Sequence, residues 1–146
     1  MGYPLKKLLI FLFPVVVMAG TGPEPQTTAL VEALRRAAPD TTDPGLYSDW
    51  RMRPTTIAAW TKRCTGVAMP AEELAANPIL ARETVTCVMG STLARELVTS
   101  GGNEELAIQR AAAWWMLGDP EQYQAPTIAT WMGRLMSNYR QLRNLY

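Results

Sequence analysis

The chain has 146 residues, of which 48% are hydrophobic and 18% charged, and its formal net charge is +1. This length suits a single domain, and the composition is that of a globular protein. A charge so close to neutral argues against electrostatic binding of nucleic acid. Histidine is absent, which removes the commonest general base and the commonest metal ligand. We therefore expect neither a metal site nor a cofactor.

Residues 1–19 have the pattern of a secretory signal peptide. Lys6 and Lys7 give a positive start, residues 8–18 form an apolar run, and Ala19 places a small residue at the cut. The run is about half the roughly 20 residues that a spanning helix needs, so we expect no permanent membrane span after cleavage. The sequence thus predicts an exported protein, periplasmic or secreted. Its mature form keeps twelve Lys and Arg against thirteen Asp and Glu.

Proline, asparagine and glycine divide the rest of the chain into helical segments. We expect a flexible leader over 20–27 and a single helical domain over 28–146. Because prolines mark helix starts and glycines mark helix ends, the predicted helices cover about 28–38, 54–66, 78–101, 103–118 and 126–146, with a short turn of helix over 71–76. No segment alternates apolar and polar residues as a strand does. The predicted fold is all-α, an irregular bundle of four to five helices.

The spacing of apolar and small residues predicts which helix faces are buried. On the last helix, residues from Ile128 to Tyr146 form an amphipathic stripe, which we expect to dock antiparallel on the preceding helix. On the long helix over 78–101 we expect one inward face, made of Leu80, Thr84, Cys87, Val88, Ser91, Ala94 and Val98.

Cys64 and Cys87 are the two cysteines of the chain. In an oxidising compartment an even pair of cysteines is most simply a disulfide. Both fall on apolar helical stripes, so we expect a bond that staples two helices. The Cys-x-x-Cys spacing of redox proteins is missing, which favours a structural role.

Trp114 and Trp115 are adjacent on one predicted helix, so their side chains point about 100° apart. We expect Trp115 to be buried beneath the last helix and Trp114 to lie nearer the edge. Together with Arg110 and Tyr123, Trp114 forms a possible binding surface for a sugar ring or a protein partner.

A motif of aromatic, proline and leucine residues lies near the end of the chain. It consists of Tyr123, Pro126, Trp131, Leu135 and Tyr139. With the predicted export, it resembles the closing helices of lytic transglycosylases over residues 115–142. The resemblance implies cleavage of peptidoglycan with a single acidic residue, for which Glu83 is the candidate. The Glu-Ser catalytic signature of that family is missing, so we expect Glu83 to be a surface carboxylate.

The function that the sequence favours is that of a binding or accessory component, with a protein or cell-wall partner that the residues do not identify. Two alternatives stay open: a lysozyme-like cell-wall hydrolase, and an exported immunity or inhibitor protein. No other catalytic residue stands out, because the chain has no Ser-His or Cys-His pair.

The predicted signal peptide gives a direct test. We expect cleavage after Ala19, so that the intact mass of the exported protein corresponds to a chain beginning at Gly20. Mass spectrometry of the protein recovered from outside the cytoplasm measures this. A mature form that keeps Met1 would contradict cleavage.

Overall fold

The computed structural model describes residues 24–146, so the predicted signal peptide and most of the predicted leader lie outside the described residues. Within them the fold is all-α, as predicted, and the β-structure is limited to an isolated bridge between Tyr47 and Met52. The elements are α1 (Pro25–Ala37), α2 (Pro54–Thr65), α3 (Ala71–Ala75), α4 (Pro78–Thr99), α5 (Glu104–Leu117), the 3-10 helices η1 (Pro120–Gln124) and η2 (Pro126–Ile128), and α6 (Ala129–Arg143).

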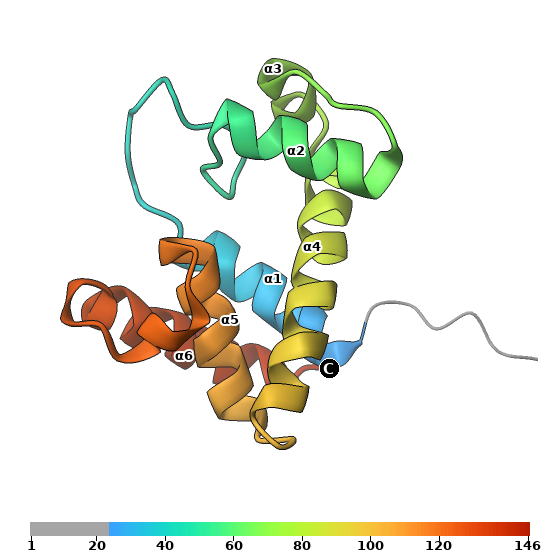
Figure 1. Cartoon of the computed structure of the whole chain (residues 1–146). Coiled ribbons are helices and arrows are strands. Elements are labelled where there is room, and N and C mark those ends of the chain that lie inside the picture. The colour runs from blue at the N-terminus through green and yellow to red at the C-terminus, as the bar shows by residue number, and fades with distance from the viewer. Residues whose placement is uncertain (1–23) are drawn as a thin grey trace, which may run out of the picture.

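The helix α4 runs along one side of the molecule and joins its two ends (Figure 1). It packs against α1, α2, α3 and α5. The helices α2 and α3 lie at one end of α4, whereas α5 and α6 lie toward the other (Figure 1). The helix α6 packs mainly on α1 and less on α5, the predicted neighbour. The reason is that α1 is buried on most of its surface, so it supplies the apolar face that α6 needs.

The helix boundaries follow local sequence signals. Prolines begin α1, α2 and α4, and the side chains of Asn77 and Asn103 accept hydrogen bonds from backbone amides in the first turns of α4 and α5. Gly66 and Gly118 end α2 and α5 in the left-handed conformation that glycine adopts without strain. The predicted leader is wrong over residues 25–27, because α1 already begins at Pro25 and Thr27 is buried.

The buried face of α4 is rotated from the predicted one. Cys87, Ala94 and Val98 are exposed, as is Ser91. The hydroxyl groups of Thr84 and Thr92 donate to carbonyls of their own helix, so both threonines pack like apolar residues. The observed buried residues are Ala81, Thr84, Val85, Val88, Met89, Thr92, Leu93 and Glu96. Thr84 and Val88 belong to both faces, but the prediction left out Thr92 and the ion-paired Glu96, because a polar residue was not expected to be buried there.

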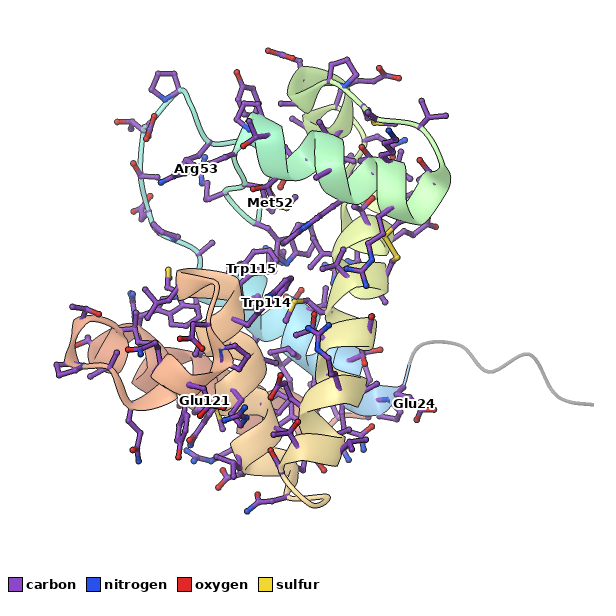
Figure 2. The ribbon with its side chains drawn as sticks, in the orientation of Figure 1. Glu24, Met52, Arg53, Trp114, Trp115 and Glu121 are labelled. Atoms are coloured by element: carbon purple, nitrogen blue, oxygen red, sulfur yellow. A yellow bond between two sulfur atoms is a disulfide. The ribbon has the colours of Figure 1, made fainter. Side chains whose placement is uncertain are left out.

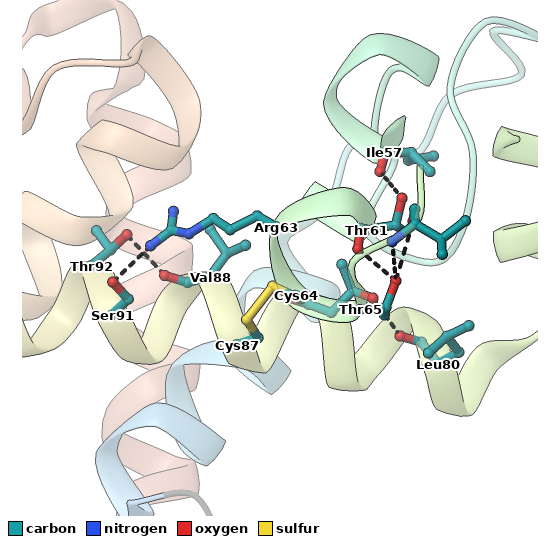
Figure 3. Close-up of a disulfide and its surroundings, with 12 residues drawn as sticks. Ile57, Thr61, Arg63, Cys64, Thr65, Leu80, Cys87, Val88, Ser91 and Thr92 are labelled. Atoms are coloured by element: carbon teal, nitrogen blue, oxygen red, sulfur yellow. Dashed lines mark hydrogen bonds between the residues drawn. A yellow bond between two sulfur atoms is a disulfide. The ribbon is translucent and has the colours of Figure 1, made fainter. Parts of the chain in front are cut away.

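The disulfide between Cys64 and Cys87 is confirmed (Figure 3). It joins the last turn of α2 to the middle of α4, and beside it the Arg63 guanidinium donates to the Ser91 hydroxyl at 2.8 Å. Cys64 is half-buried and Cys87 exposed, so the bond lies near the surface rather than on an apolar stripe. Its structural effect is to fix the end of α2 on α4.

Replacing both cysteines by serine should lower the free energy of unfolding by roughly 2 to 4 kcal/mol, because the open chain gains conformational entropy when it unfolds. Denaturant titration of the oxidised protein and the double variant measures the difference. Wild-type protein kept in reductant is the control and should match the double variant. Equal stability of the oxidised and reduced wild type would contradict this role.

Candidate functional site

The loop between α1 and α2 contains a tightly closed turn. Tyr47 and Met52 exchange two backbone hydrogen bonds of 2.8 Å, which close the loop around the four residues between them. Inside it, Ser48 and Arg51 have φ values of 64° and 54°. This left-handed region is uncommon for residues other than glycine and asparagine, and such strain concentrates at functional sites.

The turn is anchored through Trp50, which is buried. Its indole N–H donates to the Val31 carbonyl of α1 at 2.9 Å, and the Arg82 guanidinium of α4 lies 5.2 Å from the ring centre. Arg82 in turn donates to the Glu32 carboxylate at 3.0 Å. The turn is therefore held by both α1 and α4.

Glu32 is the centre of this anchor. Its carboxylate accepts hydrogen bonds from Arg35, Arg82 and Arg36. The hydrogen bonds from Arg35 contribute most to lowering the pKa of Glu32 from 4.5 to about 2, while burial of the carboxylate opposes this change and Arg82 and Arg36 add to it. The charged form of Glu32 is therefore the one that stabilises the fold.

Three tryptophans meet between α2 and α5. The Trp60 ring of α2 stacks on Trp114, with centroids 5.9 Å apart, and lies at a tilt against Trp115 at 5.3 Å. All three are half-buried, so the prediction that Trp115 is buried is wrong. The indoles of Trp114 and Trp115 both contact Trp60 of α2. This contact joins residues far apart in the sequence, so the spacing of residues within α5 could not predict it.

Residues of α1, the loop between α1 and α2, α2, α5 and α6 line a cleft of about 520 Å³. Trp131 of α6 forms part of it, and its indole N–H donates to the Ala37 carbonyl at 3.0 Å. Figure 2 shows Met52 and Arg53 on the α2 side of this region and Trp115 on the α5 side. The lining residues are Leu34, Ala38, Pro39, Leu46, Trp50, Arg51, Met52, Arg53, Thr56, Trp60, Trp115, Met116 and Trp131.

The cleft collects tryptophans from four separate parts of the chain. Trp50, Trp60, Trp115 and Trp131 line it, and Trp114, the remaining tryptophan, stacks on Trp60. Sequence reasoning assigned Trp60 and Trp131 to core stripes and Trp50 to a loop contact. The signal that could have pointed to the cleft is the pair Arg51 and Arg53, which follows Trp50 directly and precedes a helix start.

Of the predicted binding surface of Trp114, Arg110 and Tyr123, Arg110 is not exposed to a ligand. Arg110 is buried and pairs with Glu96 at 2.8 Å and with Glu121 at 2.9 Å. A buried carboxylate such as Glu96 needs a charged partner, which explains why Arg110 points inward. Tyr123 is half-buried on η1 against the core. None of these three residues lines the cleft.

Glu83, the catalytic candidate of the transglycosylase resemblance, is exposed on α4. It is not among the residues that line the cleft. Over the part of the chain that the structure describes, no group of three or more His, Cys, Asp or Glu residues is arranged to hold a metal ion. No helix within residues 24–146 is both long enough and apolar enough to cross a membrane.

Comparison with known proteins adds no family to this picture. No family model matches the chain, and searches of curated proteins and of solved structures found no match. The cleft is therefore interpreted from its own residues.

The Glu32 anchor predicts a pH dependence of stability. Because the folded state lowers the pKa of Glu32, its contribution is fully present above about pH 4.5 and is lost as the pH falls toward 2. Over this window the loss should reach roughly 1 to 2 kcal/mol in the free energy of unfolding, because solvent screens the partly exposed arginines that bind the carboxylate. Glu32→Gln should remove this part of the slope, as measured by denaturant titration at several pH values.

The exposed Glu83 supplies a matched control, since Glu83→Gln removes the same charge from the surface of α4. That variant should keep the wild-type slope. An unchanged slope in Glu32→Gln would show that the anchor carries no such stabilisation.

Proposed function

We propose that the protein is an exported binding component that takes a small organic molecule into the tryptophan-lined cleft. The observation that carries this proposal is the cleft itself. Its volume of about 520 Å³ falls within the range of about 300 to 1,000 Å³ typical of ligand pockets. Aromatic walls with a few polar groups are the usual lining of such pockets.

The walls are held in place before any ligand arrives. Trp50 and Trp131 each donate an indole N–H to a carbonyl of α1, and Trp60 is stacked between α2 and α5. Rigid walls lose little conformational entropy when they bind a ligand, so more of the contact energy appears as affinity. This arrangement supports a binding site rather than a gap between helices.

The polar side chains of the cleft favour binding over hydrolysis. They are the guanidinium groups of Arg51 and Arg53 and the hydroxyl group of Thr56. A guanidinium group stays charged throughout the accessible pH range, so it holds a ligand but does not shuttle protons. Glycoside hydrolysis needs carboxylic acids at the scissile bond, and the cleft lining supplies none.

Export is part of the proposal. The disulfide between Cys64 and Cys87 supports it, because such bonds persist in oxidising compartments. The signal-like pattern of residues 1–19 supports it independently. A periplasmic or secreted protein with a rigid cleft suits the capture of a small molecule outside the cytoplasm.

Binding can be tested with N-phenyl-1-naphthylamine, a neutral aromatic probe that fluoresces in apolar surroundings. We expect saturable binding at one site, accompanied by quenching of the tryptophans around the cleft. Trp115→Leu should weaken binding about five- to tenfold, because the probe loses an aromatic wall. Fluorescence titration measures both effects.

Trp114→Leu is the matched control, since Trp114 also stacks on Trp60 but does not line the cleft. It should change the affinity by less than about twofold, which is within the range of an indirect packing effect. Circular dichroism should show that both variants fold. Non-saturable binding, or equal effects of the two substitutions, would refute a binding site in the cleft.

A further inference from the structure

The charge at the edge of the cleft indicates what kind of molecule it receives. Resting on the function proposed above, we propose that the ligand is a free organic anion with a flat, apolar body and one acidic group. The body lies against the tryptophans, and the acidic group is bound by Arg51 and Arg53.

The two arginines have no anionic partner among the described residues. The ion pairs found there use other arginines, namely Arg35, Arg36, Arg82, Arg110, Arg140 and Arg143. Arg51 is half-buried, Arg53 is exposed, and both line the cleft. Two unpaired positive charges beside an apolar cavity complement a negative group on a ligand.

The lining also discriminates against a neutral sugar. A sugar ring carries many hydroxyl groups, which need acceptors as well as donors when they leave water. Arginine is only a donor, so among the lining side chains Thr56 alone supplies a hydroxyl acceptor. A ligand whose polarity is concentrated in one anionic group matches this set, because the guanidinium groups meet the anion and the rings cover the rest.

The backbone at Arg51 supports a role in binding. Its φ of 54° lies in the left-handed region, where asparagine or glycine is accommodated more easily than arginine. The closed turn between Tyr47 and Met52 nevertheless presents an arginine there. An arginine held under strain at the edge of a cleft fits a site built for an anion.

The test compares two probes that share one aromatic body. 8-Anilinonaphthalene-1-sulfonate is N-phenyl-1-naphthylamine with a sulfonate group added. We expect the wild type to bind the sulfonate about tenfold more tightly, the change that one charge-assisted hydrogen bond supplies. The affinity for the sulfonate should fall with added salt, whereas the affinity for the neutral probe should stay constant.

Arg51→Asn and Arg53→Gln should each weaken binding of the sulfonate about tenfold, whereas binding of the neutral probe should weaken by less than about threefold through lost packing at the cleft lining. Asparagine tolerates the left-handed conformation, so Arg51→Asn should keep or raise the melting temperature while it loses anion affinity. That pair of results separates a binding role from a structural one. Arg134→Gln is the matched control, because Arg134 is exposed on α6 away from the cleft lining.

The outcomes separate the two proposals. If the neutral probe binds in the cleft but the sulfonate binds no more tightly, or if the arginine variants leave its affinity unchanged, the anionic ligand is refuted and the binding cleft stands. If neither probe binds in a way that depends on Trp115, the binding function itself is overturned.

Discussion

The helix α4 packs against α1, α2, α3 and α5, and the arrangement of the other helices depends on that packing. Its buried face consists mainly of alanine, valine and threonine, with the threonine hydroxyl groups bonded to carbonyls of the same helix. Small side chains allow neighbours to approach closely, and the paired hydroxyl groups remove the cost of burying polar atoms. One helix therefore carries α2 at one end and α5 toward the other, and residues of both helices belong to one hydrophobic core.

The cleft follows from this separation. The helices α2 and α5 pack on different parts of the length of α4 (Figure 1). Their facing sides are joined by the contacts of Trp60 with Trp114 and Trp115. The disulfide fixes the far end of α2, and the anchored Trp50 fixes the loop that precedes α2. The wall formed by α2 is thus held at both ends, which keeps the cleft open and its shape defined.

Features set by neighbouring residues could be predicted from the sequence, and features set by distant contacts could not. Helix boundaries at Pro54, Pro78 and Gly118 follow from backbone chemistry within a few residues. The cysteine pairing followed from there being only two. The cleft escaped prediction because Trp50, Trp60, Trp115 and Trp131 come from four segments, and no spacing along the chain reports their meeting.

Some arginines of the chain form ion pairs that stabilise the fold, whereas Arg51 and Arg53 form none with the described residues and line the cleft. Arg35, Arg82 and Arg110 bind the buried carboxylates of Glu32 and Glu96, where an unpaired charge would be costly. These pairs explain why Arg110, a reasonable surface candidate from its sequence context, belongs to the core. Arg51 and Arg53 keep their charge at the edge of an aromatic cavity. Unlike Arg134, which has no ion pair within residues 24–146 either but lies outside the cleft lining, these two unpaired charges lie where a ligand in the cleft can contact them.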